Sequence, residues 1–396
     1  PARQSKSTYG ATPSLNPAGN TETVNKIGKE KLLNPESEQE RSDDPESLAE
    51  RFLVGKRKEV EQSLDKTDGC KRRRKKDVLD PAAIDKEITE ARDADEVYDI
   101  CDRNIDQFNS ANIATACNRI AKLRRGRLSP EVKTILKNLA DKAIENISVF
   151  KAREMANTAW AFATLGIRDK LLFATLSREA IRTIWDFKAQ NIANTAFSFA
   201  KLGILDEALF TAFAMESRLK IRDFDTQDIA NTAWGFATLG IRDQALFSAL
   251  STESRQKIRE FNSQALTNTA WSFAKLDIMD EALFSALATA AIQKIRDFDT
   301  QALANIAWAF ATLGIKDEAL FSALAVESRK KIRDFNEQNL ATTAWAFANL
   351  GIRDEALFSA FALQFNQKKR DFTKQAIANI AWASAMLGLG DKEFLE

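Results

Sequence analysis

Pairs of basic residues recur at one position of a repeated segment and are the side chains best suited to contact phosphate. Each pair begins the pattern Lys-x-Arg-Asp/Glu-Phe, and successive pairs are 37 residues apart. The candidate phosphate contacts are Lys220, Arg222, Lys257, Arg259, Lys294, Arg296, Lys331 and Arg333. A ladder of cations can follow a phosphate backbone. A second explanation stays open, because cations near a helix C-terminus stabilise the helix dipole and the acidic residue after each arginine can neutralise it.

A second set of polar residues changes from repeat to repeat while the positions around it stay constant. Counted from the aromatic residue of each repeat, these residues lie six before it and four after it. Together with the positions two before and one after, they follow one helical face. The candidate RNA contacts on this face are Asn191, Asp228, Asn339, Thr164, Lys201, Thr238, Lys275, Thr312 and Asn349. Such a face favours a reader of single-stranded RNA with one base per repeat. Alternatively, these positions are simply exposed.

The composition argues against catalysis and metal binding. The 396 residues include no histidine, which excludes Ser-His and Cys-His nucleophile pairs and histidine metal ligands. Cys70, Cys101 and Cys117 are too few and too widely spaced for a zinc site or a disulfide framework. There is no glycine-rich phosphate loop, and the recurring Asp-Glu pairs are expected as helix caps. We therefore expect no enzyme activity, no metal and no small-molecule cofactor.

The charge balance restricts how nucleic acid could be bound. The chain has 57 Lys and Arg against 56 Asp and Glu, a formal net charge of +1. Any RNA binding must therefore come from local groups of cations and not from the overall field. No apolar run approaches the roughly 20 residues that a membrane-spanning helix needs, so no membrane partner is expected.

These side chains must be positioned by a repeat array. The repeat aromatic is found, always 37 residues apart, at Trp160, Phe197, Trp234, Trp271, Trp308, Trp345 and Trp382. Each unit reads as a first helix of about 13 residues, ended by a glycine such as Gly240, and a second helix capped by an aspartate such as Asp243 and reaching Phe261. Neither helix can bury its apolar face alone, so neighbouring units must stack. The sequence predicts an all-α fold, a right-handed α-solenoid of 37-residue helix-turn-helix repeats.

Three regions follow from this pattern. Residues 1–80 are rich in proline, serine, asparagine and charge, which predicts a disordered N-terminal segment. Residues 81–152 are a divergent leading helical region, and residues 153–396 are the tandem repeats, the last of them incomplete. The basic run at residues 71–76 could contact nucleic acid, direct the chain to a nucleus, or be a solvated linker.

The repeat motif resembles known organellar families. The segment Leu-Ala-Asn-Ile-Ala-Trp-Ala-Phe-Ala-Thr-Leu-Gly at residues 303–314 is similar to the first helix of octotricopeptide repeats and of FAST-kinase-like and RAP-domain proteins. The leading segment at 88–123 resembles the entry region of such proteins, and the repeats also resemble subunits of the kinetoplastid RNA-editing substrate-binding complex. The units are one residue shorter than octotricopeptide units, and they lack the Pro-Pro-Pro-Glu-Trp stretch. No RAP module is seen.

The resemblance, which covers about residues 85–396, implies a function and a location. It implies a single-stranded RNA-binding protein that acts in RNA processing, stability or translation in a mitochondrion or plastid, with protein partners in a ribonucleoprotein complex. The alternative function is a protein-protein interaction scaffold that binds no nucleic acid. The alternative locations are the nucleus and the cytoplasm.

Overall fold

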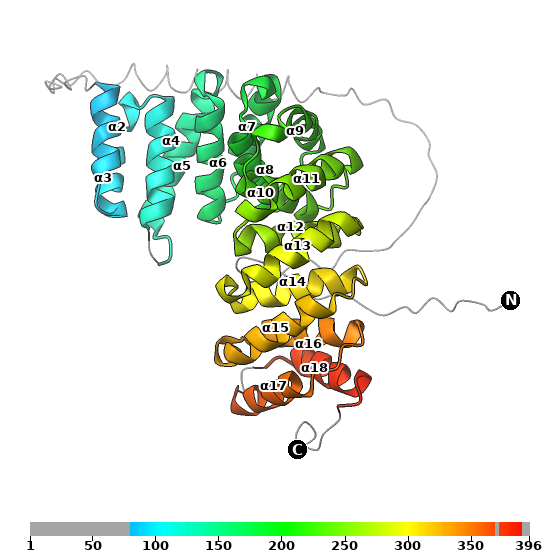
Figure 1. The fold of residues 1–396 in the computed structure, drawn as a ribbon. Coiled ribbons are helices and arrows are strands. Elements are labelled where there is room, and N and C mark those ends of the chain that lie inside the picture. Colours follow the sequence, from blue (N-terminus) through cyan, green and yellow to red (C-terminus); the bar gives the residue numbers. More distant parts are fainter. Residues whose placement is uncertain (1–79, 125, 369–371, 390–396) are drawn as a thin grey trace, which may run out of the picture. The chain divides into compact units, whose positions relative to one another are not determined.

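The computed structural model describes residues 80–124, 126–368 and 372–389, which belong to one compact unit, Asp77–Glu396 (Figure 1). All regular structure in these residues is helical, and none of their helices has the length and apolar character to span a bilayer. Except for Asp80, which caps the first described helix, the segment expected to be disordered lies outside the described residues. The basic run at 71–76 and Cys70 lie outside them as well.

Helices of two kinds alternate along the unit. Two helices lead the array, α2 (Pro81–Glu90) and α3 (Ala94–Asn104). The A helices are α4 (Ser110–Leu123), α6 (Ala152–Thr164), α8 (Ala189–Lys201), α10 (Thr226–Thr238), α12 (Ser263–Lys275), α14 (Thr300–Thr312), α16 (Glu337–Asn349) and α18 (Lys374–Met386). The B helices are α5 (Pro130–Glu145), α7 (Lys170–Arg182), α9 (Glu207–Leu219), α11 (Gln244–Gln256), α13 (Glu281–Gln293), α15 (Glu318–Lys330) and α17 (Glu355–Lys368).

Short 3₁₀ helices join one repeat to the next. They follow α3 and the B helices from α5 to α15 as η1 (Ile105–Gln107), η2 (Ile147–Val149), η3 (Ile184–Asp186), η4 (Ile221–Asp223), η5 (Ile258–Glu260), η6 (Ile295–Asp297) and η7 (Ile332–Asp334). The prediction that the second helix continues to Phe261 is therefore wrong. Helix α11 ends at Gln256, the chain tightens into η5, and Phe261 follows as a buried residue in extended backbone.

The predicted start and stop signals position the helices. The carboxylate of Asp243 accepts a 2.8 Å hydrogen bond from the backbone N–H of Leu246 and so caps α11. Gly240 has a φ of +72°, which lets the next N–H, that of Ile241, bond to the carbonyl of Phe236 at 2.9 Å and end α10. These local signals recur every 37 residues and give each repeat the same two helices.

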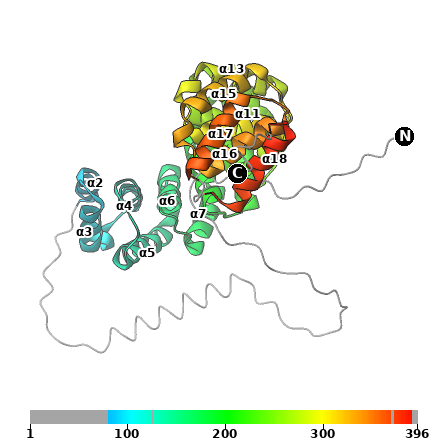
Figure 2. The ribbon, with the colours of Figure 1, turned by 90° about the horizontal axis from the view of Figure 1, so that it is seen from below.

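Stacking of the repeats produces a two-layered α-solenoid, as predicted. Each A helix packs on the preceding and following A helices, and each B helix packs on its B neighbours. In Figure 2 the B helices α11, α13, α15 and α17 lie over one another beside the A helices α16 and α18. Between the layers, phenylalanines meet edge to face across repeat boundaries, as do Phe247 and Phe273, whose ring centroids are 5.0 Å apart. The core is thus continuous from repeat to repeat.

Candidate nucleic-acid interface

One face of each A helix is turned away from both helix layers. In α10, after its first residue, the exposed or half-buried residues are Gln227, Asn231 and Thr238, and buried Trp234 lies between them. Gln227 lies seven residues before the repeat aromatic Trp234, Asn231 three before it and Thr238 four after it. This spacing places the four residues on one face of the helix. We call these four positions the A stripe. Its amide residues are Gln190, Gln227, Gln264, Gln301, Gln338 and Gln375, with Asn157, Asn194, Asn231, Asn268, Asn305 and Asn379 beside them, and of these Asn305 is buried.

The predicted reading face overlaps the A stripe only at the position four after the aromatic. The residues six before it, Asn191, Asp228 and Asn339, are buried in the first turn of their helices, where they act as caps or packing partners. The side-chain oxygens of Asn191 and Asp228 accept hydrogen bonds from the backbone N–H of the N-cap residue at 3.1 and 3.3 Å. The amide of Asn339 donates to the Thr300 hydroxyl at 3.1 Å. The prediction that they belong to an exposed face is therefore wrong.

Close packing of the A helices covers the other two predicted positions. Thr232, two before the aromatic, and Gly235, one after it, are buried between neighbouring A helices. A β-carbon on Gly235 would lie 3.0 Å from the backbone of Ala196 in α8. Small residues at this position serve the approach of two helices and not that of a ligand.

The position four after the aromatic does reach the surface. Lys275 and Asn349 are exposed there, and the half-buried candidates are Thr164, Lys201, Thr238 and Thr312. Burial lowers the pKa of Lys201, whose Nζ lies 5.8 Å from the ring centroid of Phe197. The amide of Asn349 donates to the carbonyl of Ala311 at 2.9 Å, which fixes its orientation. The identity of the residue at this position therefore changes along an open stripe.

The repeat aromatics form a ladder at the floor of the A stripe. The ring centroids of Phe197 and Trp234 are 4.7 Å apart, those of Trp234 and Trp271 6.5 Å, and those of Trp271 and Trp308 6.3 Å. The three indoles are only 3–5% exposed, whereas Trp382 near the end of the array is 41% exposed. In the middle repeats the rings therefore stabilise the stack and leave little ring surface for a ligand.

The lysines of the predicted phosphate ladder bind the preceding repeat. Nζ of Lys257 donates to the carbonyls of Arg222 at 2.9 Å and Phe224 at 2.6 Å, and it lies 2.9 Å from the carboxylate of Glu253. These three acceptors use all three N–H donors of the ammonium group. We call this arrangement a lysine staple.

The lysine staple recurs at four consecutive junctions. Lys220, Lys294 and Lys331 each donate to the two equivalent carbonyls of the repeat before them. Lys220 and Lys331 also pair with Glu216 and Glu327, whereas Lys294 has Ala290 in place of the glutamate. The four lysines therefore join neighbouring repeats. All three donors are engaged in Lys220, Lys257 and Lys331 and two of three in Lys294, which leaves little of these groups for the phosphate contacts predicted for them.

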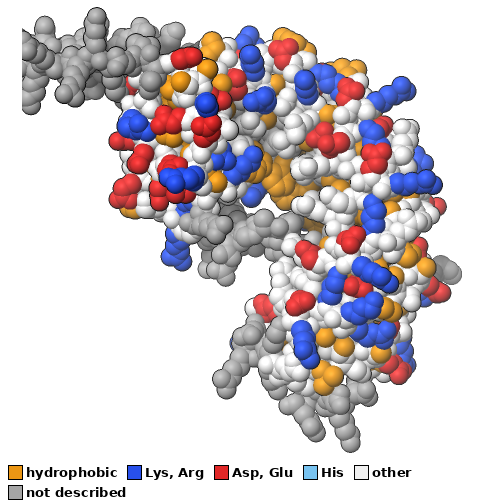
Figure 3. All heavy atoms as spheres, turned by 60° about the vertical axis from the view of Figure 1, so that its left-hand side comes forward, with side chains coloured by type: hydrophobic (Ala, Val, Ile, Leu, Met, Phe, Trp, Pro, Cys, Tyr) orange, Lys and Arg blue, Asp and Glu red, His pale blue; other side chains and the backbone are white. Residues whose placement is uncertain are grey.

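The arginines of the same pattern remain accessible. Arg222, Arg259, Arg296 and Arg333 are exposed in the 3₁₀ helices that follow the staples. Basic and acidic side chains are interspersed over the face shown in Figure 3, in keeping with the neutral composition. The surface can thus supply separate cationic contacts and not a uniform basic field.

Neither cysteines nor acidic clusters offer a reactive or metal centre in the part of the chain that the structure describes. Burial raises the pKa of the Cys101 thiol to about 12 and also raises that of Cys117. Neither thiol is therefore ionised near neutral pH. No group of three or more Cys, Asp or Glu residues in these described segments is arranged to hold a metal ion.

A known protein family has the same sequence pattern as this array. The RNA-editing substrate-binding complex 6 protein family matches residues 95–309 and 273–396. The chain belongs to this family. Membership confirms the resemblance to the repeat subunits of an RNA-editing complex. The wider resemblance to octotricopeptide, FAST-kinase-like and RAP-domain proteins stays a prediction.

Other comparisons add little to membership of the RNA-editing substrate-binding complex 6 family. No curated protein matches the chain. Among known structures, it is similar to a chain in a homology model of the full-length AP-3 complex in an intermediate open conformation. The identity is 12% and the TM-score is 0.31, over 76% of this chain and 49% of that one. This chain therefore spans about half the length of the structure it matches.

Proposed function

We propose that this protein acts in RNA processing as a subunit of an RNA-editing complex and binds single-stranded RNA along the A stripe. Its family supports the first part, because the family is named for a complex that binds RNA-editing substrates. The observation that carries the second part is the row of Gln and Asn amides, paired in five of the seven repeats, beside a position that varies. We assign it a binding role and no catalytic one, and we place it in a mitochondrion, as the resemblance implies.

The chemistry of the A stripe suits unpaired bases. An amide both donates and accepts hydrogen bonds, so Gln227 and Asn231 can bind base edges or ribose hydroxyls of an extended strand. The changing residue, which is Thr238 in this repeat and Lys275 in the next, alters the donors offered to successive nucleotides. In the repeats that have both amides, the pair would thus hold a nucleotide, and the variable residue would select it.

The electrostatics of the stripe lead to a distinctive binding profile. Because most donors of the lysine staples are engaged, phosphate contacts come from exposed arginines such as Arg259. We therefore expect RNA affinity to fall with salt by a shallow slope that corresponds to a few phosphates.

A single substitution with a matched control tests this function. Lys275→Thr gives α12 the residue that α10 and α14 already carry at this position, so the fold should be unaffected. We expect it to change the preferred base at one place in RNA selected from a random pool. Arg259→Gln, in a 3₁₀ helix, should weaken all sequences equally. If the wild-type chain at micromolar concentration and low salt retains no RNA from the pool, the proposal is wrong.

A second candidate, a protein-binding scaffold, is favoured by exposed apolar side chains. Trp185 is 65% exposed, Leu219 is 80% exposed, and Leu171, Leu205 and Met215 are also largely exposed. Where exposed apolar side chains lie together, they commonly mark a surface that contacts another protein. Association with other complex subunits that survives RNase and is lost on Trp185→Ser with Leu219→Ser would support this role. Association that RNase abolishes would exclude it.

A further inference from the structure

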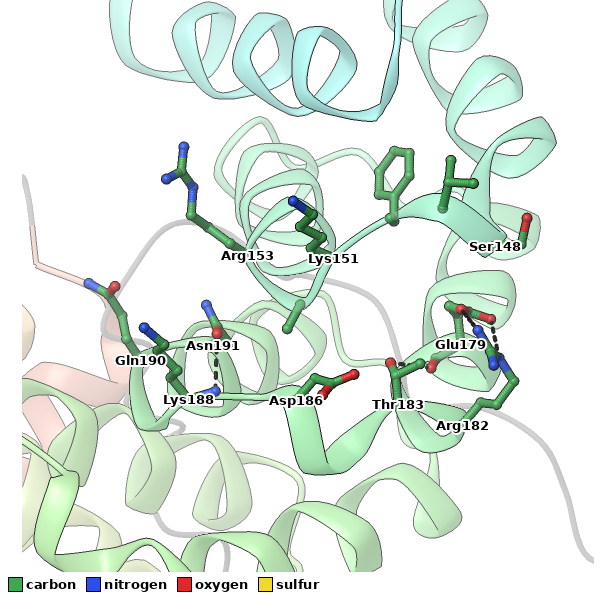
Figure 4. Close-up of a pocket in the computed structure, with 13 residues that line it drawn as sticks. Ser148, Lys151, Arg153, Glu179, Arg182, Thr183, Asp186, Lys188, Gln190 and Asn191 are labelled. Carbon is green, nitrogen blue, oxygen red and sulfur yellow. Dashed lines mark hydrogen bonds and ion pairs between the residues drawn. The ribbon is translucent and has the colours of Figure 1, made fainter.

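A hollow of about 610 Å³ lies between the first two complete repeats (Figure 4). Its walls are η2 and the start of α6 on one side, and the end of α7, η3 and the start of α8 on the other. None of the residues proposed above for base selection lies in it. It adjoins the A stripe, because Arg153 and Gln190 belong to both.

The hollow is open because this junction has no lysine staple. The residue 37 positions before Lys220 is Thr183, and its hydroxyl donates to the carbonyl of Glu179 in its own helix at 2.9 Å. This short side chain does not extend to the η2 turn as a lysine would. The space that a lysine stem fills at the four later junctions is consequently unfilled here.

Cations gather at the hollow in place of neutral and acidic residues. Lys151 and Lys188 are the N-cap residues of α6 and α8, where the following repeats have Asp225 and Asn262. Arg153 stands where every later repeat has glutamine. Figure 4 shows these three side chains on the same side of the hollow as Gln190. None of the three cationic groups has an ion-pair partner among the described residues.

The charges lining the hollow favour an anion. Its four Lys and Arg side chains exceed its two carboxylates, although the chain as a whole is nearly neutral. One carboxylate, that of Glu179, is already held by the guanidinium of Arg182 at 2.6 and 3.0 Å. The other, Asp186, lies in η3. The backbone N–H groups of Lys151 and Lys188 are bonded within their own helices, so the long side chains are the available donors.

We propose that this hollow binds a phosphate group of the RNA, through the side chains of Lys151, Arg153 and Lys188. The inference rests on the proposed function, because Arg153 and Gln190 belong both to the hollow and to the A stripe. A strand on the stripe therefore runs past the hollow. Charge-assisted hydrogen bonds from two repeats would fix one phosphate at this end of the array.

A fixed phosphate would solve a difficulty that the repeats create. Because the later units offer nearly the same amides every 37 residues, an RNA strand could shift by one repeat with little loss of contact. The hollow occurs at a junction that has both Thr183 and the two lysine caps. Binding a phosphate there would set which nucleotide faces which repeat.

The test compares two variants of the full chain that lose the same charge. The first is Lys151→Gln with Arg153→Gln and Lys188→Gln. The control is Arg222→Gln with Arg259→Gln and Arg296→Gln, in the exposed 3₁₀ helices. RNA selected by the wild-type chain is crosslinked at a photoreactive nucleotide, and the crosslinked repeat is identified by mass spectrometry. Affinity is measured over a series of salt concentrations.

The variants should differ in register as well as in affinity. We expect the first variant to bind RNA at least about tenfold more weakly, which corresponds to the loss of one charge-assisted hydrogen bond. The slope of log affinity against log salt should fall in magnitude by about 0.7, which corresponds to one phosphate of a single strand. Its crosslinks should spread over several repeats, whereas the control should weaken binding and keep the wild-type crosslink. RNAs with a 5′-hydroxyl, a 5′-phosphate or a 3′-phosphate distinguish an internal phosphate from a terminal one.

The outcomes separate this inference from the proposed function. If the wild-type chain binds RNA and the first variant retains its affinity, salt slope and crosslink, the phosphate site is wrong while RNA binding stands. If the first variant weakens binding only as the control does, with an unchanged crosslink, the hollow does not set the register and the inference is again wrong. If the wild-type chain binds no RNA, both proposals fail.

Discussion

The lysine staples provide a matched pair of perturbations within one molecule. Lys257 and Lys294 make the same two hydrogen bonds to carbonyls of the preceding repeat. Lys257 also pairs with Glu253, whereas Lys294 has Ala290 four residues before it. Replacing either lysine by methionine keeps most of the apolar stem and removes the ammonium group. The two variants therefore differ chiefly in whether a carboxylate is left without its cation.

The size of the difference follows from burial. The side chain of Glu253 is 6% exposed and that of Lys257 is 24% exposed. Breaking a buried ion pair by removing one partner costs about 3–5 kcal/mol, and partial exposure of Lys257 places the cost near the lower value. Lys294→Met loses only bonds to neutral carbonyls, which costs about 1–2 kcal/mol. We expect Lys257→Met to lower the free energy of unfolding by about 1–2 kcal/mol more than Lys294→Met.

Chemical denaturation of the full chain, combined with hydrogen exchange of the two junctions, measures this difference even where unfolding is not two-state. Adding Glu253→Gln to Lys257→Met removes the stranded charge and should restore about 1 kcal/mol or more. Equal destabilisation by the two lysine variants would refute the reasoning. The reasoning would also be refuted if adding Glu253→Gln to Lys257→Met restored none of the lost free energy of unfolding.

Three further predictions concern buried groups. Desolvation, with the nearby charge of Asp225, raises the pKa of Asp228 to about 6 from 3.8, so stability is lost as pH rises between these values. Asp228→Asn should accordingly be about 2–3 kcal/mol more stable than wild type at pH 8 by urea denaturation, with little difference near pH 4. Trp271→Ala should lower unfolding free energy by about 3–5 kcal/mol and Trp382→Ala by far less, because only the first indole is buried. Buried Cys101 should react with a thiol reagent in the native protein no faster than the chain opens, and equal rates for native and denatured protein would contradict its burial.

The helix boundaries could be predicted from the sequence because they depend on nearby residues. The contacts between repeats could be predicted less well. Gly240 and Asp243 bracket a turn by conformational preference and capping, both of which act within a few residues. The partners of Lys257 are carbonyls 33 and 35 residues earlier in the chain. A carbonyl is present at every residue, so sequence pattern gives no sign of which one a lysine reaches. Only the stacking geometry determines it.

The candidate interface was misjudged for a related reason. Variation between repeats predicted that Asp228 lies on an exposed face, whereas Gln227, which recurs in six of the seven repeats, was not among the predicted contacts. The structure reverses the two, because the third residue of a helix turns back to its own N-cap while the second points outward. Helical spacing of Gln227, Asn231, Trp234 and Thr238 was the signal that could have revealed the A stripe.

The fixed reach of the lysine staple constrains how such a chain can change in length. Each staple joins a residue to carbonyls 33 and 35 positions earlier, and each repeat packs only on its neighbours. Duplication or removal of a whole 37-residue unit preserves every one of these separations, so the array can grow or shrink by recombination between identical points. A one-residue insertion inside a unit would instead misalign the ammonium group with its acceptors. The six uninterrupted 37-residue intervals between the seven repeat aromatics are thus what selection against small insertions would leave.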